Sequence, residues 1–254
     1  MIYAPRWLFG AAVLAAVSAF PVQAQQAGGG DAFSSAETEA IESIVRDYLV
    51  THPEVLIEAL KAYEAAQREA QAKQQRDAVM AHRELLEGSA GSPVLGNPEG
   101  DVLIVEFFDY RCPYCRTVAP TIMETVRQDG GIRLVMKEFP ILGPDSVYAS
   151  RAALAAAMQG KYEAFHVALM AVDGKLTEKA VLTVAGDVGL DVAQLLQDLA
   201  APEVDDALRR NAELANALGI GGTPAFIIGD QLVPGAIGLE DLRSLIDEIR
   251  AKAS

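Results

Sequence analysis

The sequence contains few residues that could form disulfides or bind a metal. It has two cysteines and three histidines. Cys112 and Cys115 are separated by two residues, and a bridge between them would close too small a loop to constrain the unfolded chain much, which argues against a structural disulfide. A structural zinc ion needs four ligands, but His52, His82 and His166 lie far apart without ligand-like spacing. We therefore expect redox chemistry at the cysteines and no bound metal or other cofactor.

The sequence also lacks a hydrophobic run of membrane-spanning length. Its long apolar run at residues 7–20 is shorter than the roughly 18–20 residues that a spanning helix needs. The run follows Arg6 and is followed by small residues at cleavage-type positions up to Ala24. This pattern predicts a cleaved secretory signal peptide over residues 1–24 and a periplasmic protein, with a retained membrane anchor as the alternative.

Positive charge is scarce and dispersed. The chain has 21 Lys and Arg residues against 35 Asp and Glu residues, which gives a formal net charge of −14 at pH 7. The basic residues alternate with acidic ones, as in residues 73–77. Attraction to phosphates needs clustered Lys and Arg, so the composition argues against nucleic acid as a partner. The hydrophobic content of 51% is enough to bury a full core without disulfides.

The region at residues 25–91 is predicted to be helical. A capping box at residues 34–37 opens one helix, and Thr51 is expected to cap a second helix that continues to about Glu87. The far half of this second helix is polar and rich in alanine, so it cannot be an ordinary core helix. The apolar residues Val55, Leu56, Leu60 and Tyr63 approximate coiled-coil spacing. The pattern favours a self-associating stalk over a monomeric helix.

A small, polar, helix-breaking linker at residues 88–93 predicts a domain boundary. Beyond it the pattern changes to nearly continuous apolar runs, as expected for strands that are buried on both faces. The predicted strands are 102–108, 132–139, 225–228 and 231–234, and the predicted helical segments are 117–128, 145–217 and 239–251. The prediction is one α/β domain over residues 92–254 with a helical insertion at about 145–217.

The CPYC motif at residues 112–115 lies where the first strand passes into the following helix. Unpaired backbone N–H groups and the positive end of the helix dipole favour a thiolate at this place, which makes Cys112 the attacking sulfur. Cys115 lies one turn further into the helix and would resolve the mixed disulfide. The flanking Arg111 and Arg116 are expected to be solvated and to add little to thiolate stabilisation.

Over about residues 92–252 the sequence resembles the DsbA-like branch of thioredoxin-fold proteins. The resemblance rests on the CPYC motif, on Glu106 six residues before the first cysteine, on Lys137 in the next strand and on Thr223-Pro224 before a later strand. The helical insertion falls where that family has it. The resemblance implies an α/β thioredoxin fold with an inserted helical domain, preceded here by an N-terminal helical stalk.

The resemblance also implies roles for single residues. Because the family's proline opposite the cysteines is cis, Pro224 is expected to hold the loop backbone where a substrate peptide pairs with it. The residues implied to contact substrate are Pro113, Tyr114, Thr223 and Pro224. Glu106 is implied to lie beneath Cys115 and to accept its proton. A buried unpaired carboxylate is costly, so Glu106 should be neutral or paired with Lys137 as part of the catalytic set. The alternative is a Glu106 that faces water at a strand edge.

The region at about residues 36–88 resembles the N-terminal extension of ScsC-type proteins, which carry DsbA-like domains on helical oligomerisation segments and include trimeric disulfide isomerases. Thr223 before the proline resembles the isomerase branch. CPYC departs from the CPHC of the oxidases, and the missing histidine removes one source of thiolate stabilisation. Isomerase or reductase is therefore favoured, with a DsbA-like oxidase as the alternative. CPYC also resembles glutaredoxins, but export and the insertion argue against that function.

The resemblance implies protein disulfides as substrates, a membrane redox partner of the DsbD/ScsB or DsbB type, and a homo-oligomer, for which a trimer is one assembly. A rival function of another class is copper binding or copper protection. Two thiolates at a helix start could hold Cu(I), which accepts two sulfur ligands. The methionines are scattered rather than clustered, which argues against copper without excluding it.

Overall fold

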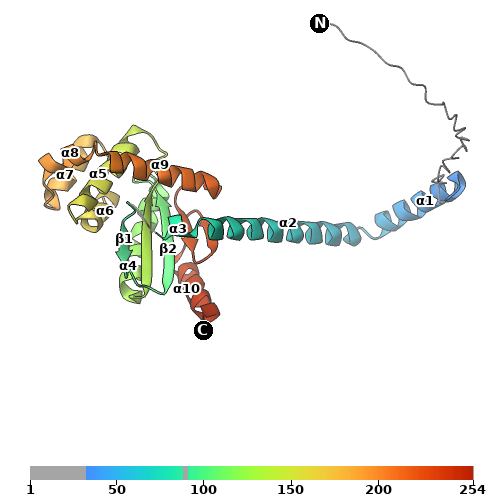
Figure 1. Ribbon diagram of the computed structural model, residues 1–254. Helices are drawn as coiled ribbons and strands as arrows, with labels where there is room; N and C mark the ends of the chain where they lie inside the picture. The colour runs from blue at the N-terminus through green and yellow to red at the C-terminus, as the bar shows by residue number, and fades with distance from the viewer. Residues whose placement is uncertain (1–32, 88–90, 254) are drawn as a thin grey trace, which may run out of the picture. The chain divides into compact units, whose positions relative to one another are not determined.

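The computed structural model describes residues 33–87 and 91–253 of the chain (Figure 1). The predicted signal peptide and residues 88–90 of the predicted linker lie outside the described residues. The chain divides into two compact units between Lys61 and Ala62. Over the described ranges, no helix combines the length and apolar character needed to cross a membrane.

Helix α1 (Ser35–Thr51) begins with the predicted capping box. The Ser34 hydroxyl accepts the Glu37 N–H, and the Glu37 carboxylate accepts the Ser34 N–H at 2.8 Å. No residue of α1 is buried. Thr51 does not cap the next helix as predicted, because it belongs to α1 and its hydroxyl donates to the carbonyl of Asp47 at 2.7 Å.

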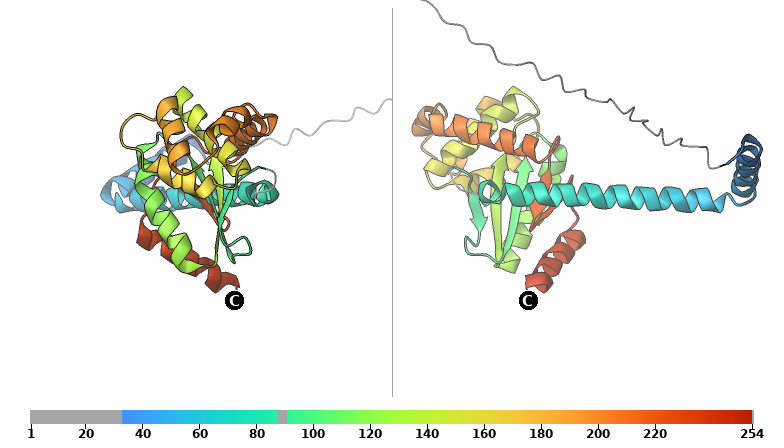
Figure 2. Two further views of the ribbon diagram at one scale, coloured as in Figure 1. Left: turned by 90° about the vertical axis from the view of Figure 1, so that its left-hand side faces the viewer. Right: turned by 45° about the vertical axis from the view of Figure 1, so that its right-hand side comes forward.

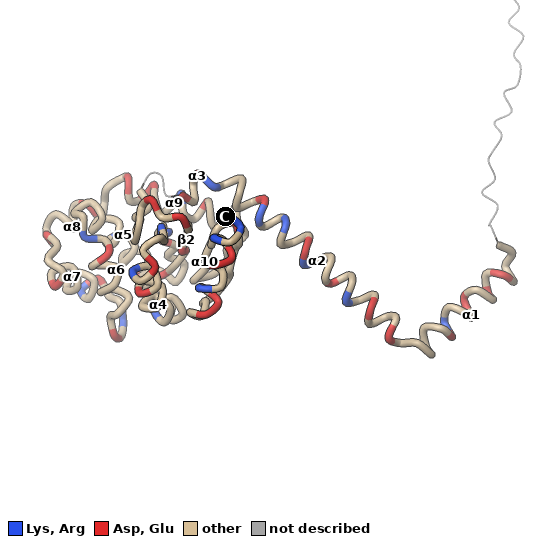
Figure 3. Tube along the Cα trace, turned by 90° about the horizontal axis from the view of Figure 1, so that it is seen from below, with Lys and Arg blue, Asp and Glu red and all other residues tan. Residues whose placement is uncertain are grey.

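Helices α2 (Glu54–Ala81) and α3 (Arg83–Leu86) replace the unbroken helix that the sequence predicts. His82 leaves helical geometry with φ −108° and ψ 17°, which separates the two. Basic and acidic residues are interspersed along α2 (Figure 3). Val79 near the end of α2 and Leu86 in α3 are buried, with 3% and 1% exposure, and both belong to the core beside the sheet.

The sheet has five strands among the described residues, in the order β1-β3-β2-β4-β5. The strands are β1 (Val94–Gly96), β2 (Val102–Phe108), β3 (Ile132–Glu138), β4 (Ala225–Ile228) and β5 (Gln231–Pro234). β2 and β3 are parallel, and the other neighbouring pairs are antiparallel. The three-residue β1 was not predicted because it is too short to show a pattern. The βαβ unit and the hairpin of β4 and β5 are confirmed.

Helices cover both faces of the sheet. α4 (Pro113–Asp129) and α10 (Leu239–Ala253) share one hydrophobic cluster with β2 and β3. The end of α2, α3 and α9 (Pro202–Ala217) supply side chains to the cluster on the other face. The strand β2 is therefore buried on both faces, as predicted. The fold is a mixed α/β thioredoxin-like fold with a helical insertion.

The insertion comprises α5 (Pro144–Met158), α6 (Tyr162–Met170), α7 (Glu178–Asp187), α8 (Val192–Asp198) and α9. These helices lie between β3 and β4 in the chain and gather at one end of the sheet (Figures 1 and 2). Their bounds match the predicted insertion closely.

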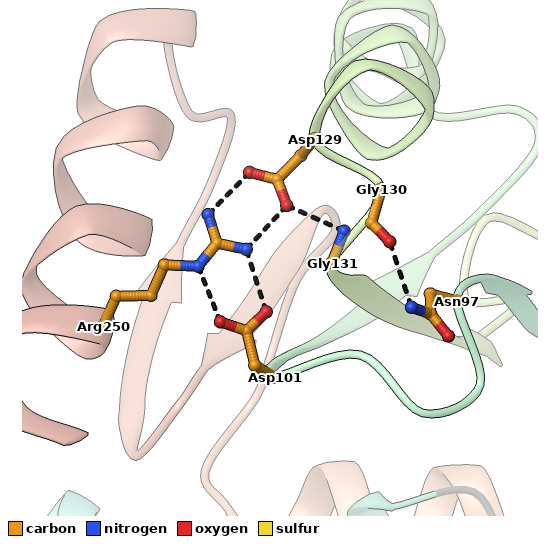
Figure 4. Close-up of polar contacts among 6 residues, drawn as sticks. All are labelled: Asn97, Asp101, Asp129, Gly130, Gly131 and Arg250. Atoms are coloured by element: carbon orange, nitrogen blue, oxygen red, sulfur yellow. Dashed lines mark hydrogen bonds and ion pairs between the residues drawn. The ribbon is translucent and has the colours of Figure 1, made fainter. Parts of the chain in front are cut away.

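Arg250 of α10 forms ion pairs at the end of the sheet opposite the helical insertion (Figure 4). The Arg250 guanidinium donates to the Asp101 carboxylate at 2.7 and 2.9 Å and to the Asp129 carboxylate at 2.8 and 2.7 Å. Asp129 also accepts the Gly131 N–H at 3.0 Å. These bonds lower the pKa of both carboxyl groups and join α10 to the start of β2 and the end of α4. They lie away from the cysteines, which are at the start of α4.

Candidate active site

The two cysteines lie at the start of α4. Cys112 is the N-cap residue with extended backbone, φ −72° and ψ 118°, and Pro113 occupies the first turn. A proline fits there because its missing N–H would have no helical partner. The helix thus begins four residues before the predicted 117. Both thiols are free, and Cys112 is 4% exposed whereas Cys115 is fully buried.

The Cys112 thiol faces the loop before β4. Its Sγ donates to the backbone carbonyl oxygen of Thr223 at 3.2 Å. The Thr223–Pro224 peptide bond is cis, which confirms the prediction for this loop. Pro224 has no backbone N–H to donate to the sulfur. The group that faces the Cys112 thiol is the carbonyl oxygen of Thr223, which accepts its hydrogen bond. Tyr114, between the cysteines, is 67% exposed.

Cys115 differs from Cys112 in its surroundings. Burial raises the pKa of the Cys115 thiol well above its usual value, and the nearby Glu106 carboxyl raises it further. The backbone N–H of Asp109 acts in the opposite direction by hydrogen bonding to the sulfur. Cys115 therefore needs a proton acceptor before it can act as a nucleophile.

Glu106 is a buried acid on the cysteine side of the sheet. It lies in β2, between β3 and β4, and is 2% exposed. Its Oε1 has no hydrogen-bond partner among the described residues. Burial raises the pKa of Glu106 to about 8. The carboxyl group is therefore mostly neutral at pH 7, and the alternative of a water-facing strand edge is wrong.

Lys137 lies on the other side of the sheet. The parallel register pairs Glu106 with Met136 and Lys137 with Phe107. Because neighbouring residues of a strand point to opposite faces, Lys137 cannot reach Glu106. Its Nζ instead donates to the Leu85 carbonyl at 2.7 Å and to the Ser92 hydroxyl at 2.8 Å, and burial lowers its pKa to about 8. The predicted pairing of Glu106 with Lys137 is wrong.

Asp109 is a site residue to which the sequence analysis gave no role. Its carboxylate is fully buried. One oxygen accepts the Arg111 N–H and the Ser146 hydroxyl, both at 2.7 Å. The other accepts the N–H groups of Ile141 at 2.8 Å and Leu142 at 3.0 Å. An aspartate directly after a buried strand predicts a turn in which its carboxylate accepts the N–H two residues later. Its bonds to Ile141, Leu142 and Ser146 cannot be predicted from the sequence pattern.

A buried polar cluster lies beside Asp109 along the chain. The Glu138 carboxylate accepts the Tyr110 hydroxyl at 3.1 Å and the Tyr162 hydroxyl at 2.8 Å. The Tyr110 hydroxyl also lies 3.1 Å from Nδ1 of His166. Burial raises the pKa of Glu138 to about 8 and lowers that of His166 to about 3. The imidazole is therefore neutral at pH 7, and the sequence analysis missed this cluster because its members are scattered along the chain.

The two arginines beside the cysteines donate to backbone carbonyls, one in α6 and one in the loop before α5. The Arg116 Nε donates to the Met170 carbonyl at 3.0 Å, and the Arg111 guanidinium donates to the Leu142 carbonyl. No group of three or more His, Cys, Asp or Glu side chains that could hold a metal ion occurs among the described residues.

Two family models match the chain. The DSBA-like thioredoxin domain matches residues 103–247, and the N-terminal domain of the copper resistance protein ScsC matches residues 37–70. "Probable disulfide bond formation protein D" of Bacillus anthracis is 28% identical over 151 residues, which is 54% of this chain and 70% of that protein. The chain spans 25% of the length of another relative, Na(+)/H(+) antiporter NhaA 3 of Salinispora tropica. The likeness to that antiporter thus concerns only a part of it.

Solved structures are similar to the chain over most of their own length. A thioredoxin-like oxidoreductase from Silicibacter pomeroyi DSS-3 is 50% identical, covers 68% of this chain and 98% of its own, and has a TM-score of 0.65. A linker-deletion variant of Proteus mirabilis ScsC is 28% identical, covers 88% of this chain and 99% of its own, and has a TM-score of 0.67. With the domain model matching more than half of its length, this chain belongs to the DSBA-like thioredoxin domain family.

Proposed function

We propose that this protein is a periplasmic disulfide isomerase or reductase that acts on protein disulfides through Cys112 and Cys115. The observation that carries the proposal is the asymmetry of the two thiols. Cys112 is the N-cap residue of α4 with its sulfur at the loop before β4, whereas Cys115 is fully buried beside the carboxyl group of Glu106. One sulfur is placed to attack and the other to resolve.

The proposed reaction begins with attack by the Cys112 thiolate on one sulfur of a substrate disulfide. The substrate S–S bond breaks, a mixed disulfide forms, and the other substrate sulfur leaves as a thiolate. Cys115 then loses its proton to the ionised form of Glu106, which is the minor form at pH 7, and attacks Cys112 Sγ. The second substrate sulfur leaves, so the substrate gains two electrons and the cysteine pair loses two. In isomerisation a substrate thiolate instead attacks the mixed disulfide, and no net electron transfer occurs.

The direction of the chemistry is inferred from the residues around the pair. The CPYC motif lacks a histidine between the cysteines, which removes one source of thiolate stabilisation and disfavours a strongly oxidising couple. Thr223 before the cis-proline resembles the isomerase branch, and the similarity to a disulfide bond formation protein supports an oxidase as the second candidate. If the protein is an isomerase, a DsbD/ScsB-like membrane partner would reduce Cys112 and Cys115. If it is an oxidase, a DsbB-like partner would oxidise them.

The N-terminal helices support a homo-oligomer. Ile44 of α1 and Leu56, Leu60 and Tyr63 of α2 are 67%, 52%, 57% and 62% exposed. Large apolar side chains that are exposed on helices are stabilised when they are buried against other helices. Several active sites on one assembly would raise the local concentration of thiols around a misfolded substrate, which suits isomerisation. The number of chains, with a trimer among the candidates, belongs to the proposal.

Trapping of thiols in cells tests the direction. Rapid acid quenching and alkylation would fix the resting redox state of Cys112 and Cys115. A mostly reduced pair is expected for an isomerase or reductase. A mostly oxidised pair would contradict this assignment and favour the oxidase.

Copper binding is the second candidate of another class. It is favoured by the match of residues 37–70 to a domain of a copper resistance protein and by two free thiols at one helix start. Titration of the reduced protein with Cu(I), with a Cys112→Ser variant as control, decides the matter. Binding of one ion that is lost in the variant would support copper, and no binding above that of the variant would reject it.

A further inference from the structure

A pocket of about 410 Å³ lies between α3 and α9, on the face of the sheet away from the cysteines. Its volume falls within the roughly 300–1,000 Å³ of small-molecule sites. All of its lining residues belong to the compact unit Ala62–Ser254. The lining includes three polar side chains, of Ser92, Lys137 and Arg210, and three apolar ones, of Leu85, Leu214 and Ala217.

Lys137 supplies a buried positive charge at this pocket. Its side chain comes from β3 and is 3% exposed. The Nζ donates to the Leu85 carbonyl and the Ser92 hydroxyl, which are both uncharged. An ammonium group has three N–H donors, so one remains after these two bonds. Burial and the positive charge of the nearby Arg210 lower the pKa of Lys137 to about 8, as expected for a cation without a counter-charge.

Arg210 of α9 brings a second positive charge to the pocket. A Cβ atom added to Gly91 would lie 3.4 Å from its Nη2, so the guanidinium lies beside the residue that precedes Ser92. Two like charges repel, and an anion between them is attracted by both. Glu213 also lines the pocket, but its carboxylate accepts a bond from the Arg209 guanidinium at 3.2 Å. The polar side of the pocket therefore attracts anions.

The remaining wall of the pocket is apolar. Leu85 of α3 is 47% exposed, and Leu214 and Ala217 of α9 line the same space. An apolar group that covers Leu85 would remove its side chain from water, which contributes favourable free energy. A bare inorganic ion would leave this wall uncovered. The pocket thus combines two cations with an apolar surface, which suits a ligand that has both kinds of group.

We infer that this pocket binds a small organic anion whose carboxylate or phosphate head group contacts Lys137 and Arg210, with its apolar body against Leu85. Lysine and arginine side chains form strong, charge-assisted hydrogen bonds with both head groups. The Ser92 hydroxyl accepts from Lys137 and has its own hydrogen to donate to the ligand. Because the site lies on the far face of the sheet from the cysteines, the ligand is not a substrate of the thiol chemistry.

Calorimetric titration of the mature protein at constant ionic strength tests the inference. The probes are phenyl phosphate and phenylacetate, which share a ring and differ in head group, with benzyl alcohol as the neutral analogue. At least one anion should bind at a single site, about tenfold or more tightly than benzyl alcohol, and raise the melting temperature. The stronger of the two anions identifies the head group. Binding of neither anion, or equal binding of benzyl alcohol, would overturn the inference.

Variants assign the binding to this pocket. Lys137→Met and Arg210→Gln should each weaken the anion's affinity by about tenfold or more. Circular dichroism shows whether Lys137→Met is folded, and if it is not, Arg210→Gln decides alone. Lys161→Met is the matched control, because the Lys161 Nζ also donates to two acceptors, the carbonyls of Val188 and Gly189, outside this pocket. Wild-type affinity in a folded pocket variant, or an equal loss in the control, would overturn the site.

Discussion

Glu106 and Lys137 lie on opposite faces of the central sheet, although they occupy neighbouring parallel strands. The register places Glu106 level with Met136 and on the side of Cys115, and it places Lys137 level with Phe107 on the side of α3. Within residues 33–87 and 91–253 the acid therefore has no cationic partner, and burial raises its pKa to about 8. A buried, protonatable group beside the resolving thiol is the chemical consequence.

Replacing this acid should impair resolution of the mixed disulfide. Glu106→Gln keeps the shape of the side chain but cannot accept a proton. Release of the second substrate thiol from Cys112 is expected to slow by about tenfold or more at pH 7, as for loss of a general base. Stopped-flow measurement of thiol release from the mixed disulfide tests this prediction. Unchanged kinetics would show that Cys115 loses its proton elsewhere.

The same variant should change how stability depends on pH. The Glu106 pKa of about 8 in the folded protein lies above its usual 4.5, so the folded state holds a proton that the unfolded state releases between these values. The stabilising contribution is complete below pH 4.5 and is lost as pH rises toward 8. The melting temperature should fall over this range, and less so in Glu106→Gln. Equal slopes of melting temperature against pH in the two proteins would contradict a buried neutral carboxyl group at Glu106. Glu138 has a similar pKa and is present in both proteins, so the variant should keep part of the slope.

Lys137→Met should act on stability and not on the cysteines. It leaves the Leu85 carbonyl and the Ser92 hydroxyl without their donor, at a cost of about 1–3 kcal/mol in the free energy of unfolding. Thiol release should keep its wild-type rate. In a double variant with Glu106→Gln, the stability effects should add within about 0.5 kcal/mol, because the side chains do not touch. A larger deviation from additivity would indicate a direct interaction between Glu106 and Lys137 and would contradict the strand register.

Removal of the N-terminal helices should produce a folded monomer only if the cut is placed correctly. A protein that begins at Ala62 keeps Val79 and Leu86 in the core beside the sheet. It should fold and scatter light as a monomer, whereas the longer mature chain is expected to scatter as an oligomer. In the mature chain, Leu56→Ser with Leu60→Ser should also weaken assembly.

A cut after Glu87 is the contrasting case. It removes Val79 and Leu86, which are 3% and 1% exposed, and exposes the cluster that they cover. The melting temperature should fall, because lost core side chains cost free energy. A monomeric mass for the mature chain at micromolar concentration would refute the oligomer.

The sequence allowed prediction of whatever is encoded locally. The CPYC motif at a helix start, the doubly buried strand β2, the helical insertion and the cis bond before Pro224 could all be predicted from motifs and periodicity, in part through the family resemblance. The face on which Lys137 lies could not, because it depends on the register of two strands that are joined by a helix. The partners of Asp109 were invisible because Ile141 and Ser146 are more than thirty residues away.

The trapping of a substrate through Cys112 tests the central claim most directly. In Cys115→Ser the resolving thiol is missing, so the mixed disulfide should accumulate and appear by mass spectrometry as a covalent adduct on Cys112 that a reductant releases. The Cys112→Ser variant should form no adduct and have no exchange activity, because Cys115 is fully buried. Adducts on Cys115 in the Cys112→Ser variant, or none on Cys112 in Cys115→Ser, would contradict the assignment of the two sulfurs.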